Sequence, residues 1–567
     1  MLSSRRVIEN LLFVFLLTLV ACNSAQDKVE IGDEIYSGVE FQMPKVIEPG
    51  FSEYTVSITE FNAVPGGQVL NTKAIADAIH NVVSHGGGKV VIPRGIWLTG
   101  PIVLQSNVNL HAEAGALVIF STNKDLYPLV ETSFEGLNTV RCQSPIYGKD
   151  LENIAITGDG VFDGSGDVWR MVKKSKLTES QWKRLVATGG FVDEKRKIWY
   201  PSESFKKGVE ISDMNVPKNF DKLEDYTAIR DFLRPVMVSL VNCNKVLLDG
   251  PVFQNSPAWN IHPLMCQNLT VRNIDVRNPW YSQNGDGIDI ESCKNTLLYN
   301  STFDVGDDAI CIKSGKDKDG RDRGIANENL IVKNCIVYHG HGGVTVGSEM
   351  SSGVKNMHVS GCTFIGTDVG LRFKSTRGRG GIVENIYISD VDMINIPANA
   401  ISFNMYYGGL SVSEMLAKSK EGNAVQEIRE VTEETPQFRN ISIKNVTCKG
   451  AHTAVYLQGL PEMNLENVYL ENINMVANNG LLCMDAKGVR IKDMKLITDA
   501  KPAVNFINAK DVEIEGLDLG DSYESMVSIS GSVTENVSIG FTSKADIEQV
   551  LVLDESVNKE SVKVSKK

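Results

Sequence analysis

The chain has 567 residues, of which 42% are hydrophobic and 22% are charged, so it is long enough to bury a large core. Its 57 Lys and Arg against 70 Asp and Glu give a formal charge of −13, which disfavours nucleic acid as a partner because binding to phosphate needs a basic face. An acidic substrate stays open, provided that a local patch of cations meets it.

The first residues have the pattern of a secretion signal. Arg5 and Arg6 precede the apolar run LLFVFLLTLV, which is too short to span a bilayer as a stable helix. The tetrad LVAC resembles a bacterial lipobox, and this resemblance implies a mature chain that starts at a lipidated Cys22. We therefore expect a signal peptide over 1–22 and a polar tether over 23–50. The protein would be an exported lipoprotein of a Gram-negative outer membrane, on its periplasmic or cell-surface side, held there only by its lipid anchor.

One amphipathic helix is predicted near the start of the folded part. In NTKAIADAIHNVV, the apolar residues Ile75 and Ile79 stand at helical spacing behind Asn71, a residue suited to cap a helix. This helix would cover the open end of the structure that follows. Two later segments, 169–235 and 405–437, break the pattern of that structure, and we expect them to be inserted loops that shape a binding site.

A repeated unit runs from about residue 240 to 540. It reads Asn, apolar, any residue, apolar, and then a second short strand with a turn. Examples are NLTVRNIDV from Asn268, NTLLYNSTF from Asn295, NLIVKNCIV from Asn329 and NMHVSGCTF from Asn356. Several units are 27 residues apart and no helical pattern lies between them, so the coils must stack to close a core.

This repeat predicts an all-β fold, a single-stranded right-handed parallel β-helix over 51–545 followed by a tail over 546–567. The recurrent Asn is expected to form a ladder of side-chain amides at one turn. Cysteines within the strands, such as Cys311, are expected to be small buried apolar residues, because zinc-type spacing is absent.

Acidic residues gather on two consecutive coils. Asp286, in NGDG, precedes Asp307, in GDDAICIKSG, by 21 residues, which is about one coil. Residues one coil apart in the same register lie about 5 Å apart. A bend at Gly306 could turn both Asp307 and Asp308 outward, away from the core. Asp289 is expected to be a turn residue.

Cations follow on the next two coils. His341 lies in HGHGG, and Arg372 and Lys374 lie two apart in LRFKS, so they share one strand face. Acids this close cannot all ionise freely, so the pKa of one carboxyl group should rise. A protonated acid beside ionised ones suits cleavage of a glycosidic bond, and Arg with Lys would hold a carboxylate on the sugar.

At these residues the chain resembles the polygalacturonase family, glycoside hydrolase family 28. NGDG, GDDAICIKSG, GHG and RFK are similar to its four motifs, in the same order. Gly285 stands where the family usually has Thr, and Phe373 stands where it usually has Ile. Both side-chain positions should point away from the charged groups. The resemblance runs from about Phe51 through the last coils.

The resemblance implies a role for each matching residue. Asp307 is similar to the general acid, and Asp286 and Asp308 are similar to the pair that activates water, which gives inversion at the anomeric carbon. His341 corresponds to the histidine that supports the protonation state of the acid. The resemblance further implies that two cations, Arg372 and Lys374, bind the carboxylate of galacturonate.

Two further residues are candidates for substrate binding. Tyr406 falls about where the family places a tyrosine that contacts substrate, and His262 could line the cleft one coil before Asp286. We expect no metal and no cofactor, a monomer, and a pectic polysaccharide or oligogalacturonide as substrate. Exo action is favoured, because the insertion over 169–235 could wall off one end of the groove.

Three alternatives stay open. Within the same family, the linkage cut could belong to rhamnogalacturonan. A pectate lyase is also built on a β-helix, and the Asp307–Asp308 pair could bind the Ca²⁺ that a lyase needs. A non-catalytic carbohydrate-binding solenoid is compatible with a lipid anchor, but binding alone does not require this cluster of acids and cations.

Overall fold

The computed structural model describes residues 32–213, 215–217, 222–408, 428–520, 527–542 and 551–566. The chain divides into two compact units at Val39 and Glu40, and the second unit holds all the features discussed below. Of the first, the described part contains the short 3-10 helix η1 (Asp33–Tyr36). The predicted signal peptide with Cys22 lies outside the described residues. Within them, no helix is both long and apolar enough to cross a membrane.

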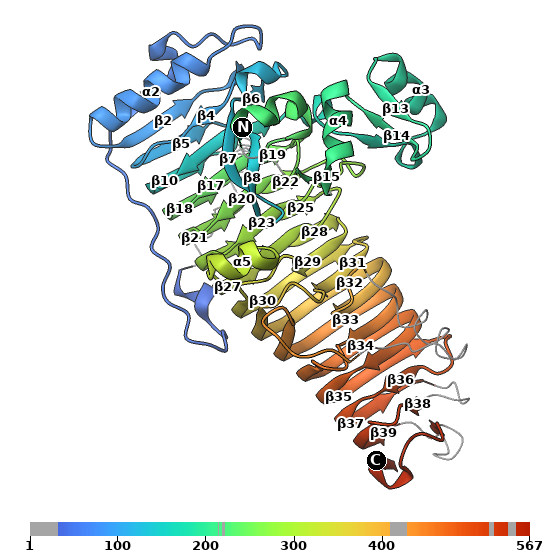
Figure 1. The fold of residues 1–567 in the computed structure, drawn as a ribbon. Coiled ribbons are helices and arrows are strands. Elements are labelled where there is room, and N and C mark those ends of the chain that lie inside the picture. Colours follow the sequence, from blue (N-terminus) through green and yellow to red (C-terminus); the bar gives the residue numbers. More distant parts are fainter. Residues whose placement is uncertain are drawn as a thin grey trace, which may run out of the picture. The chain divides into compact units, whose positions relative to one another are not determined.

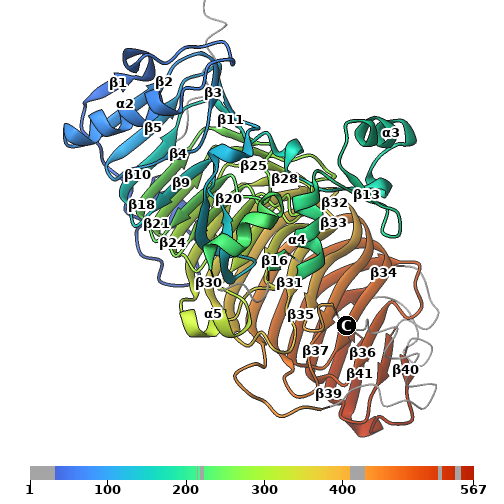
Figure 2. The same ribbon diagram turned by 45° about the horizontal axis from the view of Figure 1, so that its top comes forward.

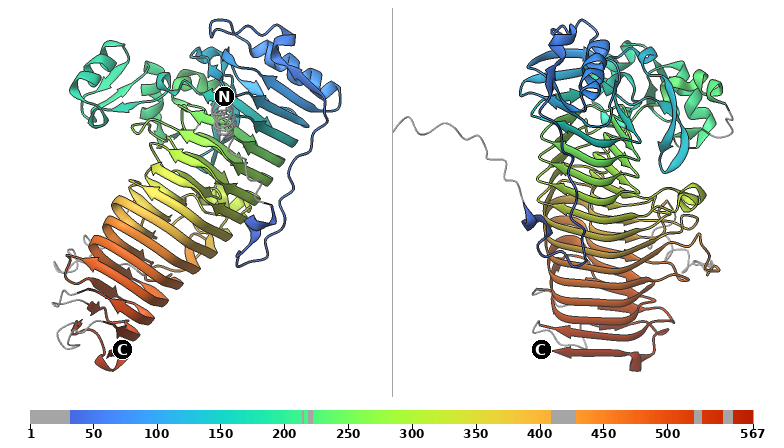
Figure 3. Two further views of the ribbon diagram at one scale, coloured as in Figure 1. Left: turned by 180° about the vertical axis from the view of Figure 1, so that it is seen from behind. Right: turned by 90° about the vertical axis from the view of Figure 1, so that its left-hand side faces the viewer.

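The second unit is a right-handed parallel β-helix, as the sequence predicts (Figures 1 and 3). Each early coil contributes one strand to each of three sheets, and strands pair in parallel with those of neighbouring coils. Sheet 1 contains β2 (Gly88–Ile92), β5 (Val108–Ala112), β10 (Glu152–Thr157), β18 (Asn244–Asp249), β21 (Gln267–Arg272), β24 (Lys294–Tyr299), β27 (Asn327–Lys333) and the first half of β30 (Val354–Ile365). Sheet 2 contains β3 (Gly95–Thr99), β6 (Ala116–Phe120), β11 (Val161–Asp163), β19 (Val252–Gln254), β22 (Asp275–Arg277), β25 (Thr302–Asp304) and β28 (Ile336–His339).

Sheet 3 carries the residues of interest. Its strands are β4 (Ile102–Val103), β9 (Ile146–Lys149), β17 (Val238–Val241), β20 (Ile261–Leu264), β23 (Ile288–Glu291), β26 (Ile310–Lys313), β29 (Gly342–Val346) and β31 (Val369–Lys374). In later coils one long strand runs through several sheets in succession. These long strands are β32 (Ile382–Asn404), β33 (Gln437–Gln458) and β34 (Leu465–Met484). The coils after them have shorter strands, which are β35 (Ala486–Thr498), β36 (Val504–Ile507), β37 (Lys510–Asp518), β38 (Val527–Ser530) and β39 (Glu535–Phe541).

Alternation along each strand sends one row of side chains into the core. In sheet 3, Ile288, Ile310, Val344 and Leu371 pair in register on successive strands, and all four are fully buried. Burying one such side chain contributes about 2 kcal/mol. The residues between them point to the opposite face of the sheet, where the chemistry lies.

The predicted asparagine ladder is present at the start of the sheet 1 strands. The side-chain amide of Asn356 donates to Asn329 at 3.0 Å, and the amide of Asn329 donates to Asn295 at 3.0 Å. These asparagines have φ between 58° and 61°, a left-handed conformation that Asn tolerates better than most residues. The ladder therefore satisfies a tight turn on each coil, and its role is structural.

Helix α2 (Thr72–Ser84) covers the first coils (Figure 1). The prediction that Asn71 caps it was wrong in one respect. Asn71 holds the N-cap position, but its side chain makes no capping hydrogen bond. Its amide group instead donates to the carbonyls of Val64, Val69 and Leu98.

Two excursions leave the early coils. The first is the antiparallel hairpin β7 (Leu129–Phe134) and β8 (Leu137–Cys142), which the sequence pattern did not reveal. The second is the predicted insertion over 169–235. It contains β12 (Val172–Lys173), α3 (Glu179–Ala187), β13 (Phe191–Asp193), β14 (Ile198–Tyr200), α4 (Glu203–Ile211), β15 (Ser212–Asp213), β16 (Val216–Pro217) and η6 (Leu223–Phe232). We call its part over 172–200 the arm, which stands clear of the stacked strands in Figure 2. Most of the insertion predicted over 405–437 lies outside the described residues.

Two predicted boundaries need correction. The expected tether over 23–50 is not free from Glu40 onward, because Glu40 accepts from His358 at 2.7 Å and Glu48 pairs with Arg272 at 2.7 Å on sheet 1. The expected tail over 546–567 also belongs to the solenoid. Strand β40 (Leu551–Leu553) pairs with β38, and β41 (Val562–Lys566) pairs with β39, because their short apolar alternation completes further coils.

Candidate active site

The charged residues singled out in the sequence meet at one edge of sheet 3. Asp286 lies two residues before β23, Asp307 and Asp308 precede β26, and His341 precedes β29. The backbone links these turns, since Gly306 N–H donates to Gly285 O at 3.3 Å and His341 N–H donates to Asp307 O at 2.8 Å. The winding of the coils therefore brings residues far apart in the sequence into one cluster, as the spacing predicts.

Asp308 is the anchor of the two cations. Its side chain is 2% exposed, with Arg372 Nη1 at 2.8 Å from Oδ1 and Lys374 Nζ at 2.7 Å from Oδ2. Burial alone would raise the pKa of Asp308, but Lys374 and Arg372 outweigh it and hold the pKa well below its usual range. The expectation that both adjacent aspartates face outward was wrong for Asp308, because the two cations stabilise its carboxylate under the surface.

The same contacts change the expectation for the cations. In this structure the head groups of Arg372 and Lys374 are engaged by Asp308, and Lys374 is 9% exposed. The carboxylate raises the pKa of both residues even though burial opposes it, so both stay charged. Arg372 keeps further donors, because a guanidinium carries five N–H groups, so a contact with a substrate carboxylate is compatible with its bond to Asp308.

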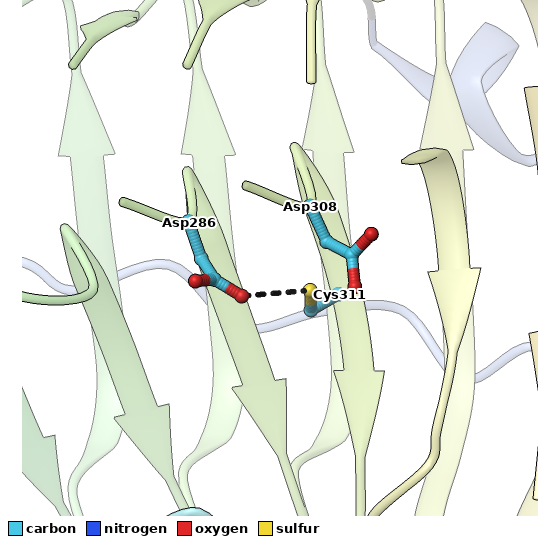
Figure 4. Close-up of side chains that lie close together, drawn as sticks. All are labelled: Asp286, Asp308 and Cys311. Atoms are coloured by element: carbon cyan, nitrogen blue, oxygen red, sulfur yellow. Dashed lines mark hydrogen bonds between the residues drawn. The ribbon is translucent and has the colours of Figure 1, made fainter. Parts of the chain in front are cut away.

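Asp286 lies beside Asp308 on the previous coil and is also buried. Figure 4 shows it facing Cys311, whose thiol donates to Asp286 Oδ2 at 3.6 Å. Burial, and then the charges of Asp307 and Asp289, raise the pKa of Asp286 well above its usual range. The prediction for Cys311 was therefore incomplete: the residue is buried, but it faces the acid cluster instead of the apolar core.

These three side chains are also the nearest match to a metal site among the described residues. One ligand atom from each of Asp286, Asp308 and Cys311 lies within 4.8 Å of the others. Two cations already neutralise Asp308, and Lys313 Nζ lies 4.0 Å from Asp286. A divalent ion at this point would meet positive charge on two sides, so the donor set fits a metal poorly.

Asp307 is the acid that solvent reaches. Its side chain is 24% exposed, and its Oδ1 lies 3.1 Å from His341 Nδ1. The backbone N–H of Asp308 donates to the same oxygen at 3.0 Å, which fixes the orientation of the carboxyl group. On the other side of the ring, Asp368 lies 3.8 Å from His341 Nε2. A substrate that approaches this edge would therefore meet Asp307 first, with the buried Asp286 and Asp308 behind it.

This geometry predicts the alkaline limb of the pH profile. The hydrogen bond with Asp307 raises the pKa of His341, and burial only partly opposes it. A raised pKa keeps the proton on the imidazole at pH values where a free histidine has lost it. If His341 supports the acid, kcat/KM should fall as the pH rises through this raised pKa, and His341→Gln should lose that limb together with about 10²-fold in kcat. An unchanged alkaline limb in His341→Gln would remove His341 from the account.

A second buried network was missed in the sequence. Lys313, at the end of β26, lies 3.0 Å from Asp289 and 3.5 Å from Glu349, with its ammonium 3.8 Å from the ring centre of Trp259. The prediction that Asp289 is a turn residue was wrong, because it lies fully buried within β23 on the outer face of sheet 3. The alternation in IDIE and ICIK carried this signal, since it places Asp289 and Lys313 on the same face as the cluster.

One of the two weaker substrate-binding candidates does not hold as predicted. His262 is 1% exposed and its Nε2 lies 2.8 Å from Glu291 Oε2, so it is a buried ion-pair partner and lines no cleft. Tyr406 lies with its ring 5.0 Å from the guanidinium of Arg377. Its neighbour Tyr407, in the turn that follows β32, has its ring centre 5.0 Å from Lys374 Nζ. Tyr407 is therefore the aromatic residue nearest the cations.

The two middle positions that depart from the family pattern behave as expected. Phe373 is fully buried and stacks on Phe403 with ring centres 4.3 Å apart. A Cβ atom at Gly285 would lie 1.8 Å from Ser282 Oγ, so this turn has no room for the usual side chain. Neither position places a group among the charged residues.

The excursions cover sheet 3 on the N-terminal side of the cluster. Phe134 of the hairpin lies on Trp259 with ring centres 4.4 Å apart, and the guanidinium of Arg141 lies over Phe134 at 4.0 Å. At the end of the insertion, the fully buried Arg234 donates to Gln283 O at 2.9 Å and to Asn284 Oδ1 at 2.8 Å. The insertion is thereby fixed to the turn that carries Asp286.

Comparison with known proteins matches this site to a family. The model of glycosyl hydrolases family 28 matches residues 230–487, which include all six clustered motif residues. The segment that carries the site, residues 230–487, therefore matches glycoside hydrolase family 28. The chain is a glycoside hydrolase, and the fold and motifs described above are those of this family.

The individual proteins compared with this chain are between 25% and 29% identical to it. A probable polygalacturonase of Vitis vinifera is 26% identical over 432 residues, which cover 74% of both chains. The exo-poly-alpha-D-galacturonosidase of Dickeya chrysanthemi is 25% identical over 71% of this chain and 64% of its own length. A solved structure, the hyperthermoactive exopolygalacturonase of Thermotoga maritima, is 29% identical with a TM-score of 0.65, over 86% of this chain and 95% of its own.

Proposed function

We propose that the protein hydrolyses the α-1,4-galacturonosidic bonds of polygalacturonate with inversion at the anomeric carbon. One observation carries this proposal: a solvent-reachable acid, Asp307, hydrogen-bonded to His341, stands in front of two buried acids with different environments. Such a set can donate one proton and accept another, which is what hydrolysis of a glycosidic bond requires.

In this proposal Asp307 gives its proton to the leaving oxygen. Asp286 and Asp308 orient and deprotonate the attacking water. The carboxylate of Asp308 keeps its charge because Lys374 and Arg372 pair with it. His341 keeps its own proton through the contact with Asp307, and this contact holds the carboxyl group of Asp307 in place.

The cations favour galacturonate as the sugar. Arg372 and Lys374 lie side by side on β31, with Tyr407 over Lys374. A uronic acid carboxylate would meet positive charge there, whereas a rhamnose residue has no charged group to offer. Cleavage of rhamnogalacturonan is therefore the second candidate, and it is supported only by the range of pectic linkages on which the family acts.

We further propose that cleavage starts at chain ends. The hairpin β7–β8 and the end of the insertion lie on the N-terminal strands of sheet 3, where a long polymer would otherwise continue along the face. Two of the relatives named above, from Dickeya chrysanthemi and Thermotoga maritima, bear names of exo-acting enzymes. A groove that is closed on one side can bind the end of a polysaccharide chain but not its middle.

The products over time test both statements. We expect polygalacturonate to release one small product from the first minutes, while the viscosity of the solution falls slowly. Rhamnogalacturonan, with the same enzyme, should release far less reducing sugar. Rapid loss of viscosity with mixed oligomers would contradict exo action, and preferential cleavage of rhamnogalacturonan would contradict the proposed linkage.

A further inference from the structure

One tryptophan stands apart from the rest. The chain has six, and five of them are between 1% and 8% exposed, whereas Trp280 is 55% exposed. An indole presents a large rigid apolar face, so leaving one in water has a free-energy cost that burial or a ligand would remove. Trp280 lies six residues before Asp286, on the turn that leads into β23.

This turn is held against the proposed catalytic coil. Ser282 donates to Pro279 O through both its N–H, at 2.8 Å, and its hydroxyl, at 2.6 Å. A Cβ atom at Gly306, directly before Asp307, would lie 2.5 Å from Pro279 O, so the two turns are in close contact. The turn that carries Trp280 is therefore packed against the turn that carries Asp307.

The other side of the turn is fixed by the arm. Tyr281 packs against the arm's small apolar cluster of Val172, Trp182 and Trp199. From the arm, Lys176 places its ammonium 5.1 Å from the ring centre of Trp280. Among the described residues Lys176 has no carboxylate within ion-pair distance. A cation and an aromatic face thus stand together at the surface, with no protein anion to occupy them.

The charge of the arm is opposite to that of the chain. Residues 172–200 contain eight Lys and Arg against three Asp and Glu, although the whole chain has a formal charge of −13. A local positive field in an acidic protein attracts a polyanion to that place and not elsewhere. Polygalacturonate has one carboxylate on each unesterified sugar and apolar C–H faces on its rings.

We propose that Trp280 and Lys176 form a binding subsite for a galacturonate residue outside the pair of sugars joined by the cleaved bond. The C–H face of the sugar stacks on the indole, and its carboxylate pairs with the ammonium of Lys176. This subsite rests on the proposed function for its ligand, but it contains none of the residues proposed to catalyse cleavage.

The test compares a polymer with the shortest substrate. In Trp280→Ala and in Lys176→Ala, KM for polygalacturonate should rise about fivefold more than KM for digalacturonate, since only the polymer reaches the subsite. Lys176→Arg should restore most of the affinity, and Lys183→Ala, on the exposed face of α3, is the matched control that should behave as wild type. Equal changes with both substrates, or no change with the polymer, would overturn the subsite.

A binding measurement separates this proposal from the proposed function. Affinity electrophoresis in a gel that contains polygalacturonate is run with the Asp307→Asn protein, because this measurement of binding does not require cleavage. In this gel, the Trp280→Ala change should reduce the retardation of the Asp307→Asn protein. Fully methyl-esterified pectin has no carboxylate to pair with Lys176, so this contact should not retard the protein with or without the Trp280→Ala change. If the wild-type enzyme cuts no polygalacturonate but Trp280→Ala weakens binding, the function fails and the subsite stands. If cleavage occurs but retardation is unchanged, the subsite fails alone.

Discussion

Asp307→Asn should lower kcat on polygalacturonate by about 10³-fold or more while the protein stays folded. An amide has the shape of the carboxyl group but cannot donate the proton that the leaving oxygen needs. Its oxygen can still accept from Asp308 N–H, the contact that Asp307 Oδ1 makes at 3.0 Å, so the turn keeps its geometry. The side chain is 24% exposed, and the melting temperature should change little. Kinetics at saturating substrate and a thermal melt check the two statements.

A matched control lies three residues earlier on the same coil. Asp304 is 51% exposed and its Oδ1 lies 2.9 Å from His339 Nδ1, so it reproduces the aspartate–histidine pair outside the cluster. Asp304→Asn should keep wild-type turnover. If Asp307→Asn retained more than a tenth of the activity, another group would have to be the acid.

Lys313→Met should be the most destabilising single change at this site, by about 3–5 kcal/mol, because removing one partner leaves buried charge uncompensated. Methionine keeps the length and apolar character that pack against Trp259. Asp289 and Glu349, at 3.0 Å and 3.5 Å from Lys313 Nζ, would lose their cation. Chemical denaturation, followed by fluorescence, measures the free energy of unfolding.

The loss should depend on pH with a defined sign. Burial already raises the pKa of Asp289 to about 6, and Lys313 helps to hold the pKa of Glu349 at about 2. Without Lys313 both pKa values should rise, so the folded state binds more protons. The deficit is therefore full when the acids are ionised and shrinks as the pH falls below their raised pKa values. Lys492→Met, which removes an exposed partner of Glu471 at 3.1 Å, should show neither the large loss nor this recovery. A deficit that grew at low pH would contradict the assignment.

The features that the sequence predicted depend on the regular spacing of the coils. The leading Asn of each unit is enough to place Asn295, Asn329 and Asn356 on one ladder, although 34 residues separate the first two and 27 the last two. The same regularity puts Asp286 and Asp307 on adjacent turns, because the strands that follow them pair in register. In a solenoid, the sequence period therefore predicts where a residue lies in the structure.

What escaped prediction depends on contacts between the coils and their excursions. His262 looks like a cleft residue in the sequence, yet it is buried as a partner of Glu291, which also pairs with Arg323 of α5 (Asp317–Arg323). The burial of Asp308 could not be read from its neighbours in the chain either, since its two cations lie two coils away on β31. The burial of these residues depends on packing between elements that are far apart in the sequence, so a local sequence pattern does not reveal it.

The central statement is that acids from consecutive coils form one hydrolytic centre for polygalacturonate. The most direct test is incubation of polygalacturonate with the wild-type protein in excess chelator, with reducing sugar and ultraviolet absorbance followed together. We predict a steady release of reducing ends with no rise in absorbance, because hydrolysis needs no bound cation and forms no unsaturated product. Absorbance that rises only when Ca²⁺ is added, or no release of reducing ends at all, would contradict this account.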